Sequence, residues 1–224
     1  MSPIDGERSK WTKTVVFVAM GDSLTVGSQY STQEDELPEP TPYTTFLEEK
    51  TRKMLEESSV RGIRVEFVNR GINGELTEGM LGRFNRDVLG SKPDAVIILG
   101  GSNDLGWGLD PSSVAWNLTE MYRGALDHRI QPIACTIPSV LGFDEGIEPR
   151  LRLNQIIKKT CAALGILCVD LFTATADSAG RLRKEYSNDG LHLSTAGYEA
   201  MAEAMFSGAV SAIVTHYLGA SPQS

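Results

Sequence analysis

Cysteine is scarce in this chain of 224 residues, which has only Cys135, Cys161 and Cys168. Their number is odd and no two of them form a Cys-x-x-Cys pair, so the sequence indicates neither a disulfide framework nor a zinc site. A buried thiol behaves as a small hydrophobic side chain. We therefore expect all three cysteines to be core residues, and we expect no metal ion.

Long apolar runs and an excess of positive charge are also missing. The run from Val15 to Met20 follows a charged N-terminal stretch and is too short for a membrane span or a signal-peptide core. We expect no membrane span and, by default, a cytoplasmic protein. The formal net charge is −8 without a compensating basic stripe, so a nucleic acid would be repelled and is not an expected partner.

Several familiar catalytic motifs are absent as well. The chain contains no Gly-x-Ser-x-Gly elbow, no Gly-x-x-x-x-Gly-Lys loop and no His-Glu-x-x-His pair. These absences argue against an α/β-hydrolase elbow and give no support to nucleotide hydrolysis or zinc proteolysis.

The sequence does contain a regular alternation of two kinds of segment. Short runs rich in Val and Ile alternate with longer amphipathic stretches, which is typical of an α/β fold with a parallel sheet covered on both faces. We predict one domain over residues 1–224, with flexible ends at 1–12 and 219–224. The predicted strands are 14–20, 63–69, 94–99, 131–137 and 166–170, and the predicted helices are 43–57, 77–89, 111–128, 148–164 and 195–217.

The segment from Ser28 to Pro42 interrupts this alternation. It has three prolines and four acidic residues, so it is predicted to be an irregular surface loop. A loop of this length in a compact domain is often functional. Two interpretations stay open, a lid over a neighbouring site and a solvated insertion.

Polar residues and glycines gather where the first three predicted strands end. The segments are Gly21-Asp22-Ser23-Leu24-Thr25, Asn69-Arg70-Gly71-Ile72-Asn73-Gly74 and Gly100-Gly101-Ser102-Asn103-Asp104. Carboxyl ends of parallel strands share one edge of the sheet, where ligands bind. We expect these loops to bring a serine hydroxyl, an asparagine amide and several backbone amides to one cleft. Acyl transfer needs such a set, together with a base.

Three histidines are available as the base. His128 and His216 lie in the last turns of predicted helices, where the helix dipole and solvent explain them. His192 lies in an irregular stretch before the last helix, and Asp189 precedes it by three residues. The Asp189 carboxylate can hold the imidazole in one tautomer and leave the other ring nitrogen for Ser23. Taken alone, this pair is also compatible with an ordinary turn.

Four motifs together resemble those of the SGNH hydrolases, also called the GDSL family. They occur in family order as Gly21-Asp22-Ser23-Leu24 with Thr25 and Gly27, Gly74 after Asn69, Gly101-x-Asn103-Asp104, and Asp189-x-x-His192. The resemblance implies a flavodoxin-like three-layer α/β/α sandwich with a parallel sheet of about five strands. It also implies a serine esterase, lipase or thioesterase that needs no metal and no cofactor.

The resemblance further assigns a role to each residue. Ser23 is implied as the nucleophile, His192 as the general acid and base, and Asp189 as the residue that orients it. The oxyanion hole would consist of the Ser23 and Gly74 amides and the Asn103 side chain. Asp22 and Asp104 are interpreted as carboxylates that fix their loops through backbone amides.

The substrate is left open by the sequence. Hydrolysis of a small carboxylic ester through an acyl-enzyme is the main hypothesis. A carbohydrate O-acetylesterase is an alternative, because Trp107 follows the Asn103 loop and could stack on a sugar, whereas Trp116 is predicted to pack within its helix. A thioesterase or lysophospholipase would use the same residues. A non-catalytic carbohydrate-binding module is a further alternative, although a binding module has no need of a nucleophile, a base and oxyanion donors together.

Overall fold

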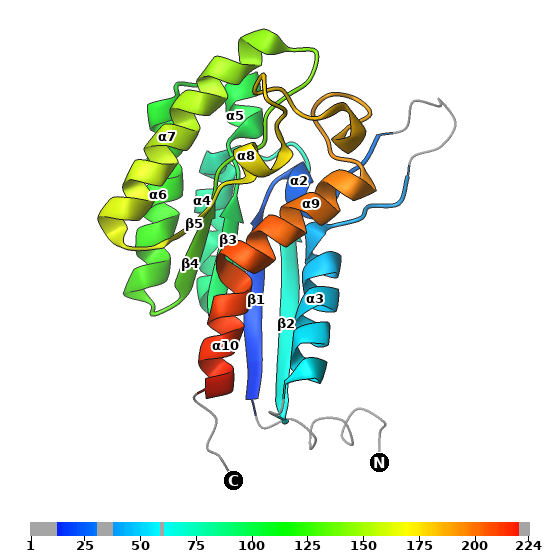
Figure 1. Cartoon of the computed structure of the whole chain (residues 1–224). Coiled ribbons are helices and arrows are strands. Elements are labelled where there is room, and N and C mark those ends of the chain that lie inside the picture. Colours follow the sequence, from blue (N-terminus) through cyan, green and yellow to red (C-terminus); the bar gives the residue numbers. More distant parts are fainter. Residues whose placement is uncertain (1–12, 31–37, 59–60, 220–224) are drawn as a thin grey trace.

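The computed structural model describes residues 13–30, 38–58 and 61–219 (Figure 1). Within these residues five strands form one parallel sheet in the order β2-β1-β3-β4-β5. The predicted α/β fold is confirmed, and every predicted strand is present with ends that differ by at most two residues. The strands are β1 (Lys13–Gly21), β2 (Ile63–Gly71), β3 (Ala95–Leu99), β4 (Gln131–Cys135) and β5 (Leu167–Val169).

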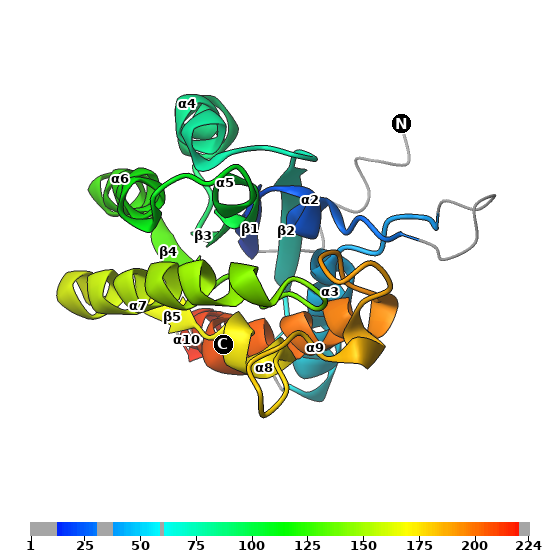
Figure 2. The same ribbon diagram turned by 90° about the horizontal axis from the view of Figure 1, so that it is seen from above.

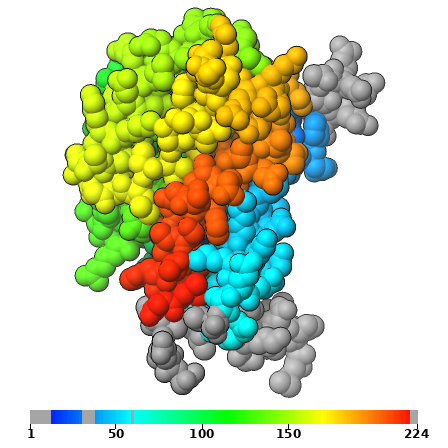
Figure 3. Space-filling view, in the orientation of Figure 1, coloured from blue at the N-terminus to red at the C-terminus, as the bar shows by residue number. Residues whose placement is uncertain are grey.

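Helices cover both faces of this sheet (Figure 2). On one face α4 (Thr77–Asp87), α6 (Pro111–Asp127) and α7 (Ile147–Leu164) lie side by side. On the other face α3 (Tyr43–Glu57) packs against α9 (Thr195–Met205), which leads towards α10 (Ser211–Gly219). Figure 3 shows the C-terminal segment, in orange and red, lying against the blue and cyan surface of α3. The three layers agree with the predicted sandwich.

Three short α-helices among the described residues were not predicted from the sequence. They are α2 (Ser23–Val26), α5 (Ser102–Gly106) and α8 (Leu171–Thr175), and each directly follows a strand or its first loop. A helix of four or five residues has little more than one turn, so it carries no hydrophobic period that a sequence pattern could reveal.

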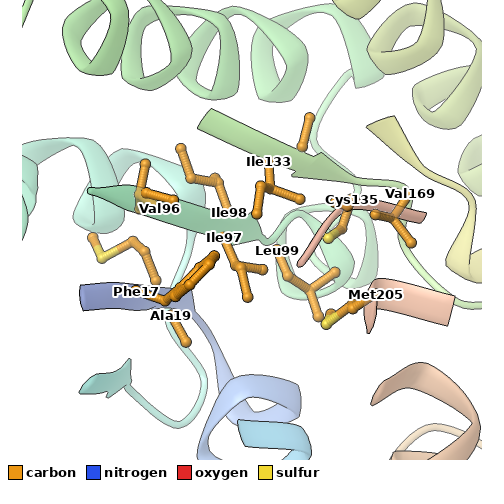
Figure 4. Packing of buried hydrophobic residues seen from close by; sticks show 14 of the residues in the cluster. Phe17, Ala19, Val96, Ile97, Ile98, Leu99, Ile133, Cys135, Val169 and Met205 are labelled. Carbon is orange, nitrogen blue, oxygen red and sulfur yellow. The ribbon is translucent and has the colours of Figure 1, made fainter. Parts of the chain in front are cut away.

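The sheet forms the core because its central strands are apolar on both sides. All five residues of β3 are fully buried, as expected for a parallel strand between two helical layers. Figure 4 shows its side chains packed with those of neighbouring elements, among them Phe17, Ile133, Val169 and Met205. The rings of Phe17 on β1 and Phe67 on β2 stack with centroids 4.9 Å apart, which fixes the edge strand to its neighbour.

The predicted C-terminal helix differs from the observed one. Residues 195–217 are not one regular α-helix, since a π-helical turn over Phe206–Val210 separates α9 from α10. In this turn the Ser207 hydroxyl donates to the carbonyl of Glu203, and Gly208 lies close to Val169 of β5. A wide turn with a small residue lets the helix stay in contact with the sheet. Gly219, the first residue of the predicted C-terminal flexible end, is the last residue of α10. Residues 1–12 and 220–224 lie outside the described residues, so the flexible ends stay a prediction.

The strand order reverses its direction between β1 and β3. The chain runs from β1 outwards to β2 on one side, and then from β3 outwards to β5 on the other. Helical connections diverge at such a switch point, so their loops leave room for a ligand at the carboxyl ends of the strands. The loops after β1 and β3, which carry Ser23 and Asn103, flank this position.

Candidate active site

The turn after β1 presents Ser23 at the start of a helix. Asp22 is the N-cap of α2, and its carboxylate accepts a hydrogen bond of 3.0 Å from the amide of Leu24. Ser23 is the first residue of the helix and is 8% exposed. Its amide therefore has no acceptor within the helix and is free for another oxygen. Only glycine fits at position 21, since a Cβ there would lie 2.4 Å from the carbonyl oxygen of Leu99.

The loop before α9 holds His192 by several hydrogen bonds. The Nδ1 atom of His192 lies 2.8 Å from Oδ2 of Asp189. The other carboxylate oxygen of Asp189 accepts from the backbone amides of Leu191 and His192. The Ser187 hydroxyl donates to the carbonyl of His192 and accepts from the amide of Gly190. These hydrogen bonds all lie within residues 187–192, and they fix the orientation of the imidazole.

The remaining ring nitrogen of His192 faces the serine. Its Nε2 atom lies 3.1 Å from Oγ of Ser23, although the two residues are 169 positions apart in the chain. The structure thereby brings Asp189, His192 and Ser23 together in a continuous hydrogen-bonded row. With the proton of Nδ1 directed at Asp189, Nε2 is the acceptor for the hydroxyl proton of Ser23.

Burial and hydrogen bonds act on the Asp189 carboxyl in opposite directions. Burial raises its pKa, but hydrogen bonds from the His192 side chain and from the amides of Leu191 and His192 outweigh this effect, so the pKa lies below its ordinary value. Asp189 is therefore ionised at neutral pH and can stabilise a protonated imidazole.

The loop after β2 and the start of α5 are in contact with each other. Gly74 has φ +72°, a left-handed conformation that favours glycine. The Asn103 side-chain amide donates a hydrogen bond of 3.0 Å to the carbonyl of Glu75, which follows Gly74 directly. One hydrogen of that amide remains for another acceptor, because a side-chain amide has two. Asn103 and Gly74 are thus held next to each other.

Asp22 and Asp104 fix these loops, as the sequence predicted. Asp104 is buried and accepts from both the amide and the hydroxyl of Thr77 at the start of α4. Asp22 is also buried; burial, followed by the nearby charge of Asp104, raises its pKa to about 7, against the lowering effect of the Leu24 amide. The carboxyl next to Ser23 is therefore partly protonated at neutral pH.

The first residues of the predicted surface loop lie across the site. The ring of Tyr30 lies against that of His192, with centroids 4.5 Å apart. The Tyr30 carbonyl accepts from the Asn188 side chain, and the Ser28 carbonyl accepts from the hydroxyl of Tyr198. Residues 28–30 and 38–42 have no regular structure, in agreement with the prediction, while residues 31–37 of the predicted loop lie outside the described residues.

Sequence reasoning missed Tyr30 and Ser187 as part of the site. Both lie in irregular segments whose composition alone is that of a solvated loop, so no sequence signal distinguished them. The prediction for Trp116 was wrong, since its side chain is 59% exposed on α6. Trp107 is 79% exposed just beyond α5.

The other two histidines lie outside this arrangement. His128 caps α6, where its Nδ1 atom lies 2.8 Å from the carbonyl oxygen of Gly124, and His216 contacts the ring of Tyr217 on α10. Of the three free cysteines, Cys135 and Cys161 are buried and Cys168 is half-buried. Within the described ranges no cluster of His, Cys, Asp or Glu suitable for a metal ion was found. No helix in the same ranges is long and apolar enough to cross a membrane.

Comparisons with known proteins show the family and the fold. The model of the GDSL-like lipase/acylhydrolase family matches residues 19–200. A lipase/acylhydrolase from Enterococcus faecalis has a similar structure, with a TM-score of 0.68 and 26% identity over 85% of this chain and 93% of that one. None of the curated proteins searched matches the chain.

Two further solved structures share the fold at lower identity. A GDSL-like lipase from Bacteroides thetaiotaomicron VPI-5482 has a TM-score of 0.67 and 21% identity, over 96% of this chain and 92% of that one. An acetyl xylan esterase from Geobacillus stearothermophilus has a TM-score of 0.68 and 22% identity, over 89% and 95% of the two chains.

Proposed function

The chain belongs to the GDSL-like lipase/acylhydrolase family and is a carboxylic ester hydrolase, and we propose that it works through an acyl-enzyme formed on Ser23. The single observation that carries this proposal is the row of 3.1 Å and 2.8 Å contacts from Ser23 through His192 to Asp189. A hydroxyl, an imidazole and a carboxylate in this order form the arrangement that activates a serine for attack on a carbonyl carbon.

In the first step, Oγ of Ser23 attacks the ester carbonyl while Nε2 of His192 takes the hydroxyl proton. The negative charge that develops on the carbonyl oxygen is stabilised by the Ser23 and Gly74 amides and by the second hydrogen of the Asn103 amide. The intermediate collapses, and the alcohol leaves with the proton from His192. In the second step, His192 takes a proton from water, which attacks the acyl-enzyme. This intermediate collapses, Oγ of Ser23 leaves with the proton from His192, and the acid is released.

The test is replacement of the nucleophile. The Ser23→Ala variant should lose hydrolysis of p-nitrophenyl acetate by about 10⁴- to 10⁶-fold, together with covalent labelling by a fluorophosphonate. Ser91→Ala is a matched control, because Ser91 lies just before β3, at the opposite end of the sheet. A Ser23→Ala protein that keeps most of its esterase activity would refute the mechanism. If the wild-type protein is not labelled, a non-catalytic module would become the better interpretation.

A second candidate is hydrolysis of acetyl esters on a carbohydrate. Two observations favour it: the exposed ring of Trp107, whose amide donates to the carbonyl of Asn103, and the similarity to the acetyl xylan esterase. An exposed indole beside an oxyanion donor is well placed to stack on a sugar ring.

The two candidates are separated by substrate and by variant. Acetate release from acetylated xylo-oligosaccharides should be compared with hydrolysis of p-nitrophenyl acetate, butyrate and octanoate, a thioester and a lysophospholipid. Trp107→Ala should impair only the saccharide reaction if the sugar stacks there. Trp116→Ala is the matched control, since its indole is exposed on α6. Equal effects of Trp107→Ala on all substrates would count against the carbohydrate candidate.

A further inference from the structure

A buried arginine binds the segments that carry the candidate oxyanion donors. Arg83 on α4 is only 8% exposed. Its Nε atom donates to both carboxylate oxygens of Glu75, at 2.7 and 3.0 Å, and its Nη2 atom donates to one of them at 2.5 Å. The planar guanidinium thus holds the side chain of Glu75 by a bidentate contact, a geometry that a lysine cannot reproduce.

The same guanidinium binds the ends of two strands. Nη2 of Arg83 donates to the carbonyl of Arg70 at 2.8 Å and to that of Gly21 at 3.3 Å. Gly21 ends β1 and lies two residues before Ser23, whereas Arg70 lies near the end of β2. One side chain therefore connects the turn of the nucleophile with the loop that begins after β2.

Glu75 extends these connections to the third loop. Its carboxylate is held by Arg83, its amide nitrogen is bonded to Gly74, and its carbonyl accepts from the side chain of Asn103. Arg83 is therefore connected to each donor assigned to the oxyanion hole. It binds the carbonyl of Gly21, two residues before Ser23. Through Glu75 it is connected to Gly74 by a peptide bond and to Asn103 by a hydrogen bond.

We propose that Arg83, acting through Glu75, is a positioning residue that sets the oxyanion donors Ser23, Gly74 and Asn103 relative to one another. This inference rests on the proposed function. Fixed donors stabilise a developing charge because they need no rearrangement during the reaction, so a small displacement reduces the rate strongly. The sequence gives no hint of this role, since an arginine on an amphipathic helix is ordinarily a solvated residue.

The test compares Arg83→Lys and Arg83→Met with Arg86→Met. Nη1 of Arg83 also donates to Asp87, at 2.9 Å. Arg86 is a matched control because it lies on the same helix and binds the same carboxylate, yet its side chain is 74% exposed. We expect both Arg83 variants to lower kcat for p-nitrophenyl acetate by about 10- to 100-fold with KM changed less than twofold, because the displaced groups act in the transition state. Arg86→Met should behave as the wild type.

The rate is expressed per active site. Active sites are counted by the end-point of fluorophosphonate labelling, so that unfolded protein does not contribute to the enzyme concentration. If Arg83→Met fails to fold, Arg83→Lys decides the question. Glu75→Gln should show the same selective loss of kcat. Arg83→Lys combined with Asn103→Ala should lose clearly less than the product of the two single losses, because both changes damage the same hole.

The two proposals fail in different ways. Full activity in Ser23→Ala would refute the acyl-enzyme mechanism, whatever the Arg83 variants do. If Ser23→Ala is inactive but the Arg83 variants keep the wild-type kcat per labelled site, the mechanism stands and the positioning role is wrong. A lowered Tm with unchanged kcat per site, or losses that multiply with that of Asn103→Ala, would likewise overturn the role.

Discussion

The ring of Tyr30 lies against the ring of His192, with centroids 4.5 Å apart and an angle of 39° between the planes. Tyr30, which is 47% exposed, thus covers one side of His192, the general base of the proposed triad. A second contact holds the start of the acidic loop next to the loop of His192, because the side chain of Asn188 donates to the carbonyl of Tyr30. An aromatic neighbour limits the orientations of the imidazole and excludes water from one of its faces.

The first prediction concerns this contact. Tyr30→Ala should lower kcat/KM for p-nitrophenyl esters by about 2- to 10-fold, the range expected from the loss of one aromatic pair. Tyr30→Phe keeps the ring and should remain close to the wild type. Steady-state kinetics with the acetate, butyrate and octanoate esters measures the effect. Equal kcat/KM values for the two variants would show that the ring contact with His192 does not contribute to the rate.

The second prediction concerns the oxyanion hole. Asn103→Ala should lower kcat by about 10²- to 10³-fold with little change in KM, because it removes a donor that acts on the charged intermediate. Asn117→Ala is the control, since the amide of Asn117 also donates within the protein, to the hydroxyl of Thr77. A loss of less than fivefold in Asn103→Ala would exclude Asn103 from the hole.

The third prediction concerns the carboxylate behind the histidine. Asp189→Asn should lower kcat by about 10³- to 10⁴-fold, because an amide cannot stabilise the imidazolium and favours the wrong tautomer. Asp144→Asn removes an exposed carboxylate that pairs with Arg181 and should leave kcat unchanged. Single-turnover kinetics of acylation measures the effect. Equal activities of the two variants would contradict the assigned role of Asp189.

The fourth prediction concerns stability and pH. The pKa of Asp22 is raised from 3.8 to about 7, so between these values the native state retains a proton that the unfolded state has released. The contribution of this group to the free energy of unfolding is therefore greatest below about pH 4. It falls as pH rises from there through 7, by about 1.4 kcal/mol for each unit of the pKa shift.

Asp22→Asn should remove this dependence. The amide oxygen of asparagine can still accept from the Leu24 amide, so the cap of α2 is kept while the titrating group is lost. Urea unfolding from pH 4 to pH 8 should give a flatter profile for the variant than for the wild type. An identical slope in the two proteins would show that Asp22 is not the group responsible.

The strands and long helices could be predicted because each is encoded locally. The five apolar residues of β3 predict a buried strand, and the amphipathic spacing in 43–57 predicts α3 with the ends that it has in the structure. The short helices α2 and α5 could not be predicted, although they carry Ser23 and Asn103, because one turn has no period. The π-helical turn at 206–210 depends on packing against β5, which a local pattern does not contain.

The candidate site divides in the same way. The sequence by itself determined which groups are candidates for the reaction, at the ends of strands and in the loop before the last helix, because motifs of a few residues specify turns, caps and chemistry. Only the tertiary structure decided which groups meet: Nε2 of His192 with Ser23 across 169 residues, Tyr30 with the imidazole, and Arg83 with Glu75 and two strand ends. These contacts depend on how the strands are ordered and how the loops fold back over them, and such long-range geometry leaves no mark on the spacing of neighbouring residues.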